Sequence, residues 1–502
     1  MEKIIKYRLW LMLVVVTSLQ VVSCSDFLDE QPETKLIEEE VFGDEEKLTL
    51  MISGLYTQWR ETRQDRSMLY LSLGTDEVKQ GGQQILENSD QAALDKYNGA
   101  LSAPNTTVTG EWSKRAKIIA PAAKGVFYAP NDKLKAEAAF LRAAVNFELV
   151  QFWGPIPIVD VEDMKYGRQP ITAVYPFIIR DLEFAAEHLP ATQEDKKMPA
   201  KGAAQALLGK IYMYAPEDSG VRDYQKAMEY FDMVIPNYTL IPNYADLFNT
   251  TLDQNSSEVI YAFQFRNQDN DNNMVQHHAG SRPVADLDGN TYFGGYDLAL
   301  PTRYYYEDVW EGLDGDTRKE ASLRTDFTLP DGRVPGPSWT GQADELEAHT
   351  RKFEDIRTQG QQNFWYSGGL IYYLRLADIL LLKAECLNEL GNTAEAVNLV
   401  NSTVRARAFG GTLSAEEAWP TGMSQEEFRS QIMDERMREL GFEGWRRMDL
   451  IRTGNFVSYI QDRNPWANEE GTIQEFHKYW PIPDTEIRLN EYINPEDQNP
   501  GY

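Results

Sequence analysis

Apolar residues between Leu376 and Leu390 recur three and four positions apart, and this spacing constrains the fold more than any other feature of the chain. The pattern predicts a helix with one wide apolar stripe, which another helix must cover. Gly391 follows the stripe and predicts the end of this helix, because glycine adopts the left-handed cap conformation without strain. A second helix is predicted from Ala394 to about Ala408. The short turn between the two predicts an antiparallel helix pair.

Comparable segments occur along the rest of the chain. Ser424 and Glu427 form a capping box that predicts another helix start, and Asp223 is a predicted N-cap. Repeated helix pairs with alanine and glycine at the crossings resemble tetratricopeptide-type repeats, although no strict period of about 34 residues is kept. The sequence therefore predicts a mainly α-helical scaffold. Its earlier helices are predicted over residues 134–152, 175–187, 201–214 and 223–234.

Residues 66–115 and 239–370 have a different composition, rich in Asn, Asp, Gly, Pro and Tyr. We expect long irregular loops there, with a few short strands such as 259–265. Loops held on a rigid scaffold commonly carry the binding residues of a protein. These two regions are therefore where a ligand site is predicted.

The N-terminus has the layout of a secretory signal. Lys3, Lys6 and Arg8 precede an apolar run over residues 9–16, which is shorter than the about 20 residues that a membrane span needs. Cys24 follows residues 1–23 in the position of a bacterial lipoprotein cysteine, whose thiol takes up lipid. We expect the mature chain to contact the membrane through this N-terminal lipid only. An ordinary signal peptide with an incidental cysteine is the less favoured alternative.

Charge and cysteine content exclude several classes of function. The chain has 49 basic and 78 acidic residues, a net charge of −29, so nucleic acid and anionic lipid headgroups are poor partners. Cys386, the second of two cysteines, shares a helical stripe with Leu382 and Leu390. It is therefore predicted to be a small buried side chain rather than a nucleophile.

Five stretches of the chain carry recognisable motifs. They are Cys24–Asp29 with Gln31-Pro32, Glu137–Ala144 with Phe152–Ile158, Arg375–Glu385 with Asn401–Arg407, Glu435–Leu450 with Arg452 and Gly454, and Pro481–Pro483 with Gln498–Tyr502. In this order they resemble the SusD/RagB nutrient-binding lipoproteins of the Bacteroidetes outer membrane. One matching stretch would be weak evidence, but five in order are specific.

The resemblance implies a single globule over residues 24–502, built on about four tetratricopeptide-like helix pairs with long loops on one side. Its parts would be an N-terminal part over 24–235, a loop-rich ligand side over 236–370 and a C-terminal part over 371–502. The resemblance also implies an outer-membrane position facing the medium. The implied partner is a SusC-like TonB-dependent outer-membrane barrel, with the ligand held between the two proteins. The family is not catalytic.

Acidic residues occur in pairs that glycoside hydrolysis could use, since that reaction commonly needs two carboxylates. Glu435, Glu439 and Glu443 recur four apart, but arginines stand among them, so a structural ion-pair network is favoured. Asp76-Glu77 and the acids near Arg318 are interpreted in the same way. The sequence therefore predicts no catalytic residue.

No metal or cofactor site is predicted. None of the five histidines has the helical spacing of a zinc pair, and no glycine-rich phosphate loop is present. A calcium site in the Asp/Asn-rich segment 269–273 stays open, although a solvated loop is favoured.

Aromatic residues give the stronger signal for a ligand. A sugar ring has an apolar face that packs on a flat aromatic ring, and hydroxyls that bond to polar side chains around its edge. The two loop regions supply both kinds of group. The candidates are Asp76, Lys79, Tyr97 and Asn98 in the first region, Tyr292, Phe293 and Tyr296 in the second, and further along Trp339, Trp365 and Tyr366.

We therefore expect a surface lipoprotein that binds an oligosaccharide and delivers it to a transporter without catalysis. One alternative is a peptide-binding or assembly component of such a transporter. The other is a lipid-anchored glycoside hydrolase.

Overall fold

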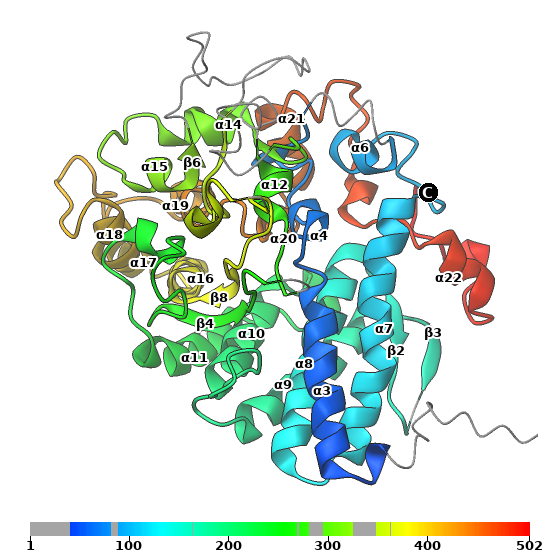
Figure 1. Ribbon diagram of the computed structural model, residues 1–502. Helices are drawn as coiled ribbons and strands as arrows, with labels where there is room; N and C mark the ends of the chain where they lie inside the picture. The colour runs from blue at the N-terminus through cyan, green and yellow to red at the C-terminus, as the bar shows by residue number, and fades with distance from the viewer. Residues whose placement is uncertain are drawn as a thin grey trace, which may run out of the picture.

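The structure is a computed structural model that describes residues 41–81, 89–162, 164–268, 271–280, 295–324, 348–361 and 363–502. It is mainly α-helical, as predicted, with a few short strands (Figure 1). Within these ranges, every helix is too short or too polar to cross a lipid bilayer.

The helices fall into a first series before residue 235, short helices between 235 and 370, and a last series after 375. They are α3 (Glu45–Arg60), α4 (Arg66–Tyr70), α6 (Ser89–Lys96), α7 (Thr106–Tyr128), α8 (Asp132–Trp153), α9 (Ile171–His188), α10 (Lys201–Tyr214), α11 (Tyr224–Val234), α12 (Val275–Ala279), α14 (Arg303–Tyr306), α15 (Arg318–Ser322), α16 (Leu376–Glu389), α17 (Thr393–Val400), α18 (Ala406–Ala408), α19 (Gln425–Leu440), α20 (Arg446–Arg452), α21 (Phe456–Arg463) and α22 (Asp484–Leu489).

The long helices pack in chain order to form one continuous stack. α3 packs on α7, α7 on α8, α8 on α9, α9 on α10, and α10 on α11. α11 then packs on α16, although about 140 residues of sequence separate them, and α16 packs on α17 and α19. The stack is visible as the blue-to-green helices and the helices beside them in Figure 1. The loop-rich segment therefore leaves the stack and returns to it at neighbouring positions.

Most predicted helices are confirmed close to their predicted ends. α10 spans residues 201–214 as predicted, and Asp223 caps α11 by accepting a hydrogen bond from the Lys226 N–H at 3.0 Å. The Ser424–Glu427 capping box opens α19, with both reciprocal contacts present. Gly391 has a φ of 85°, as its predicted capping role requires.

Other boundaries differ from the predictions. α9 begins at Ile171, four residues earlier than predicted, and Pro176 lies inside it. The helix predicted over 394–408 contains a π-helical turn at 401–405 between α17 and α18. The loop prediction for 66–115 is wrong where α4 and α6 lie and at its end, where α7 begins at Thr106. Gly110, Gly125 and Pro121 interrupt the helical pattern of α7, which hides it from sequence analysis.

The strands form two-stranded antiparallel sheets, and one of them closes the loop-rich segment. β4 pairs with β8, so the chain enters and leaves the segment side by side. The predicted strand over 259–265 is thus confirmed over 259–263. The pairs are β1 (Val78–Lys79) with β5 (Leu300–Pro301), β2 (Ile156–Ile158) with β3 (Lys165–Gln169), β4 (Val259–Phe263) with β8 (Ile371–Arg375), and β6 (Leu323–Arg324) with β7 (His349–Thr350).

The C-terminal tail covers the core. Trp480 donates its backbone N–H to the Phe152 carbonyl at 2.7 Å, and the Asn499 amide donates to the carbonyl oxygens of Trp153 and Trp480. Trp153 and Trp480 are buried. Cys386 is buried as predicted, with its sulfur 3.5 Å from the Met213 sulfur, and burial raises the pKa of its thiol.

Candidate functional site

The acidic pairs that could suggest hydrolysis form a buried ion-pair network. We call it the ionic centre, and its members are fully or almost fully buried. Glu435 pairs with Arg318 at 2.8 Å and with Arg405 at 3.0 Å. Glu439 pairs with Arg318 at 3.1 Å and also with Arg375 and Arg407. The remaining members are Glu258, Lys352, Arg438 and Glu443.

The charges of the ionic centre hold its acids ionised. Burial alone would raise the pKa of Glu435 and Glu439, but the surrounding guanidinium groups hold both pKa values well below the usual range. α19 ends at Leu440, so Glu443 lies beyond the helix and reaches Arg375 at 2.8 Å from the following turn. Carboxylates paired in this way have neither the exposure nor the free oxygens that hydrolysis of a glycan would need. The structural interpretation of these acids is confirmed.

Three of the predicted ligand residues lie inside the protein. The carboxylate of Asp76 bonds to the Arg446 guanidinium at 2.5 and 2.7 Å, and Asp76 is fully buried. Tyr97 is also buried and donates its hydroxyl to the Gly74 carbonyl at 2.8 Å. Lys79 is buried, with its ammonium 5.5 Å from the Trp466 ring centroid. This placement corrects the prediction, since a buried and paired side chain does not face a ligand.

The other predicted residues divide into described and undescribed ones. Asn98 is half-buried, and its side-chain oxygen accepts the Ala100 N–H at 3.1 Å, which makes it a turn residue. Tyr296 is half-buried and is discussed below. Four residues lie outside the described residues: Cys24, Tyr292, Phe293 and Trp339.

Half-buried aromatic rings meet where α12 contacts the segment that follows residue 294. The Tyr296 ring lies 5.6 Å from the His277 ring, and the His277 ring lies 6.1 Å from the Trp365 ring. Tyr366 continues the series at 6.1 Å from Trp365. We call these four residues the aromatic cluster. All four are half-buried, so part of each ring faces outward.

The backbone holds the aromatic cluster in place. Tyr296 donates its N–H to the Gly280 carbonyl at 3.1 Å, and Leu298 donates to the His278 carbonyl at 2.9 Å. Trp365 is held next to Phe364, at 4.8 Å between ring centroids. The two hydrogen bonds join α12 and Gly280 to the segment that follows residue 294.

One arginine extends the aromatic cluster. The Arg66 guanidinium lies 4.8 Å from the Tyr296 ring centroid, within the range of a cation–π contact. It also contacts His278 Nε2 at 3.5 Å and the Gln91 side-chain oxygen at 3.3 Å. Burial, together with the charge of Arg66, lowers the pKa of His278 to about 3, so this ring is neutral at pH 7.

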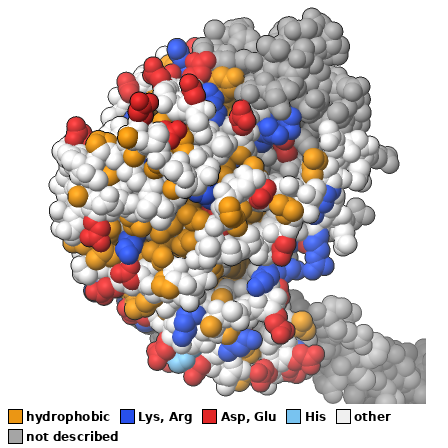
Figure 2. All heavy atoms as spheres, turned by 90° about the vertical axis from the view of Figure 1, so that its left-hand side faces the viewer, with side chains coloured by type: hydrophobic (Ala, Val, Ile, Leu, Met, Phe, Trp, Pro, Cys, Tyr) orange, Lys and Arg blue, Asp and Glu red, His pale blue; other side chains and the backbone are white. Residues whose placement is uncertain are grey.

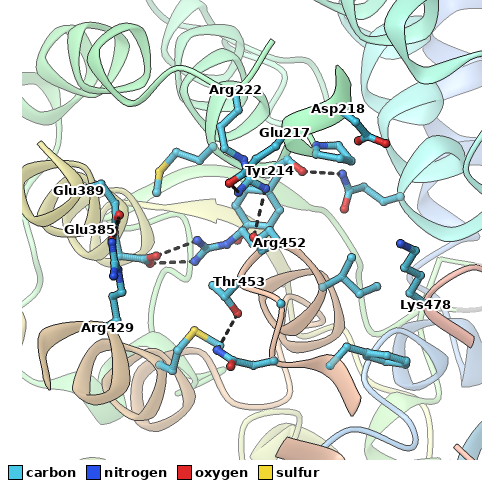
Figure 3. A pocket seen from close by; sticks show the side chains of 18 of the residues that line it. Tyr214, Glu217, Asp218, Arg222, Glu385, Glu389, Arg429, Arg452, Thr453 and Lys478 are labelled. Carbon is cyan, nitrogen blue, oxygen red and sulfur yellow. Dashed lines mark hydrogen bonds and ion pairs between the residues drawn. The ribbon is translucent and has the colours of Figure 1, made fainter. Parts of the chain in front are cut away.

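A separate cavity of about 890 Å³ lies between the helical stack and the C-terminal part (Figure 3). α10, α11, α16, α19 and α20 contribute to its walls, together with the segment around 475–479. Its walls carry half-buried tyrosines, among them Tyr224, Tyr459 and Tyr479. The size is within the range of ordinary small-molecule sites.

Most charges of this cavity are paired with one another. Glu385 accepts two hydrogen bonds from Arg452, at 2.7 and 2.8 Å, and Glu389 pairs with Arg429 at 2.7 Å (Figure 3). Lys478 is exposed and projects toward the open space. The cavity can take a polar molecule, but most of its charged groups are already paired with one another.

The surface on the left-hand side of Figure 1 carries a band of hydrophobic side chains within mixed charge (Figure 2). Met233 at the end of α11, which lies on this side, is 51% exposed. Bands of this kind are typical of surfaces that contact other proteins.

In the part of the chain that the structure describes, no group of three or more His, Cys, Asp or Glu side chains could hold a metal. The segment considered for calcium is described only from Asp271 on. Asp271 pairs there with Arg60 and lies 3.5 Å from Arg266. Its carboxylate is therefore used by arginines.

Comparison with known families identifies the class of protein. A model of the SusD family matches residues 257–502, and a model described as starch-binding and associating with outer membrane matches residues 26–213. This chain therefore belongs to the SusD family, as its sequence motifs indicate.

Relatives cover the whole chain. SusD-like protein P2 of Formosa agariphila is 28% identical over 99% of this chain and all of its own length. The starch-binding protein SusD of Bacteroides thetaiotaomicron is 25% identical over 76% of this chain and 74% of its own.

Solved structures share the fold. A SusD homologue from Bacteroides thetaiotaomicron has a TM-score of 0.77 at 22% identity, covering 93% of this chain and 99% of that one. A laminarin-binding SusD-like protein has a TM-score of 0.72 at 24% identity, covering 91% of this chain and all of that one.

Sequence analysis missed two members of this region, Arg66 and His277. His277 gives no signal for this role in the sequence, because the spacing of the five histidines bears only on a zinc site. Arg66 carried no signal of its own, because its position beside Tyr296 comes from contacts between residues 230 positions apart. The spacing of Arg60, Arg63 and Arg66 by three could have drawn attention to it.

Proposed function

We propose that this protein binds an oligosaccharide through the aromatic cluster and delivers it to a SusC-like TonB-dependent barrel, without catalysis. The carrying observation is the cluster itself: four half-buried ring groups from α12 and from the loops that contact it. Relatives named for starch or laminarin binding support the proposal.

The geometry suits a sugar better than an apolar ligand. Aromatic rings that face outward can pack against the C–H face of a sugar, while polar groups at the edge bond to its hydroxyls. Such bonds replace bonds to water and so contribute little net free energy each. Affinity is therefore modest, and recapture next to a transporter compensates through effective concentration.

Binding is tested with the full-length protein, purified in detergent, on a glycan array and against a peptide pool. Glycan binding is expected, and Tyr296→Ala should weaken it while leaving the melting temperature nearly unchanged. Binding of peptides alone would replace this function with the peptide-binding alternative. Unchanged glycan affinity in Tyr296→Ala would move the site away from the aromatic cluster.

The absence of catalysis is supported by the pairing of Glu435 and Glu439 with arginines in the ionic centre. Incubation of the bound glycan with pure protein should release no reducing sugar. Release of reducing sugar would contradict this part of the proposal.

The membrane anchor rests on the signal layout before Cys24, and the protein partner is supported by the hydrophobic band of Figure 2. Mass spectrometry of the mature N-terminus should find acyl chains on Cys24, and Cys24→Ser should release the protein from membranes. Affinity purification from the native envelope should recover a barrel protein. An acyl-free mature protein would contradict the anchor.

A further inference from the structure

Arg66 differs from the two arginines that precede it at the same spacing. Arg60 pairs with Asp271, and Arg63 pairs with Glu148 at 2.8 Å. Arg66 has no carboxylate partner within ion-pair distance among the described residues, although the chain has a large excess of acids. Its hydrogen bonds go to a neutral imidazole and an amide.

Asp65, the acid next to Arg66 in the sequence, uses its side chain for a backbone contact. Asp65 accepts the Met274 backbone N–H at 2.8 Å and so helps to fix the start of α12. The Gln91 oxygen that Arg66 contacts is shared with the Tyr70 hydroxyl, which donates to it at 2.9 Å. These groups orient Arg66. The nearby Asp65 carboxylate compensates its charge in part, but among the described residues no carboxylate pairs with Arg66 directly.

The charge lies at the edge of the aromatic cluster. Arg66 is half-buried, and the central carbon of its guanidinium lies 4.8 Å from the Tyr296 ring centroid. A guanidinium presents several N–H donors in one plane, which is the geometry that carboxylate and sulfate oxygens match. A partly desolvated cation without a direct carboxylate partner gains most from an anionic ligand.

The negative net charge of the protein does not prevent such binding. At physiological ionic strength, exposed charges farther than about 8 Å apart are largely screened. A ligand bound at the aromatic cluster is therefore influenced mainly by the positive charge of Arg66 next to it, which favours an anionic ligand.

We propose that the ligand is an acidic glycan, and that Arg66 binds its carboxylate or sulfate group while the aromatic cluster packs against its sugar rings. This inference rests on the proposed function, because it assigns a charge to the glycan that the same site binds. Arg66 is a specificity residue for that ligand.

The test uses the full-length protein on an array that contains neutral, uronate-containing and sulfated glycans. Hits are expected among the acidic glycans. The best hit is then titrated beside its carboxyl-reduced or desulfated form, and the acidic form should bind about tenfold more tightly. Which acidic group gives hits, uronate or sulfate, identifies the anion.

Variants separate the role of Arg66 from general charge. Arg66→Gln should remove the difference in affinity between acidic and neutral forms, whereas Arg66→Lys should keep part of the difference. Arg266→Gln is the matched control, because it removes an equal charge from an exposed arginine that contacts Asp271. It should leave the preference unchanged. Melting temperatures confirm folding of each variant.

The outcomes separate the two proposals. Hits among neutral glycans alone, or an acidic preference that survives Arg66→Gln, would overturn the acidic-glycan inference and leave glycan binding standing. Binding to no glycan on the array would overturn the proposed function itself, and with it this inference.

Discussion

Arg375 in the ionic centre and Arg66 beside the aromatic cluster are both arginines next to a tyrosine ring, yet their surroundings differ completely. Arg375 lies 6.0 Å from the Tyr244 ring centroid, is buried, and bonds to three carboxylates. Arg66 lies 4.8 Å from the Tyr296 ring centroid, is half-buried, and bonds only to neutral acceptors among the described residues.

The comparison shows that residue type alone does not distinguish a structural arginine from one that can bind a ligand. What distinguishes them is whether protein carboxylates already neutralise the charge and whether water reaches the side chain. Four predictions follow from this contrast, and the first concerns the ionic centre.

Glu439→Ala should destabilise the protein by about 3–5 kcal/mol, because it leaves three buried guanidinium groups with less compensating charge. Urea unfolding of the variant and the wild type measures the difference. Arg429→Ala removes an exposed ion pair with Glu389 and serves as the control, with an expected cost below about 1 kcal/mol. A loss below 1 kcal/mol for Glu439→Ala as well would mean that the ionic centre is not structural.

The second prediction concerns Glu77, a buried acid near the turn that follows α19. Its main contact is a backbone N–H rather than an arginine. It accepts the Phe442 N–H at 2.7 Å, and burial raises its pKa from 4.5 to about 7. The folded state therefore holds this proton more tightly than the unfolded chain, so the contribution of Glu77 to stability is lost as pH rises from about 4.5 to 7. Glu77→Gln should remove this loss, which is about 3 kcal/mol.

The measurement is the difference in unfolding free energy between Glu77→Gln and the wild type, taken at several pH values from 4 to 8. It should shift in favour of the variant as pH rises through this window. The same substitution at the exposed Glu416 is the control and should give a flat difference. A flat difference for Glu77→Gln would be the contrary result.

Trp365→Ala tests whether the glycan binds at the aromatic cluster or in the cavity of Figure 3. It should weaken glycan binding about tenfold, because a half-exposed ring that packs on a sugar is lost. Tyr459→Ala changes a half-buried ring of the cavity and should leave the affinity unchanged. Calorimetric titration measures both, and the reverse order of effects would place the glycan in the cavity.

Ser424→Ala should cost about 1 kcal/mol by removing the cap of α19, the helix that carries Glu435 and Glu439. Ser430→Ala, at an exposed position within the same helix, should change the unfolding free energy by less than about 0.5 kcal/mol. Equal effects of the two substitutions would show that the capping box does not stabilise α19.

The helices could be predicted well where local signals are complete. Asp223, Ser424 and Gly391 mark helix ends by chemistry that acts within a few residues, and all three serve as predicted. α7 and the π-helical turn at 401–405 could not be predicted. Their stability comes from packing against neighbouring helices rather than from the local pattern.

The ligand side could be predicted less well. Interleaved glutamates and arginines correctly predict the ionic centre, but its partners Glu258 and Arg318 come from distant segments. Asp76 and Tyr97 lie in the expected loop region and yet point inward. Loop composition predicts a region for a ligand site, while the direction of each side chain depends on tertiary contacts.

The pairing of β4 with β8 has a consequence for how this family can change its ligands. It fixes the two ends of residues 264–370 next to each other, and α11 and α16 pack together on either side of that junction. Lengthening a loop between fixed ends costs only about 0.6 kcal/mol for each doubling of its length. Loops within this segment can therefore change in length at little cost, whereas Arg318 and Lys352, which join the ionic centre, have to keep their places.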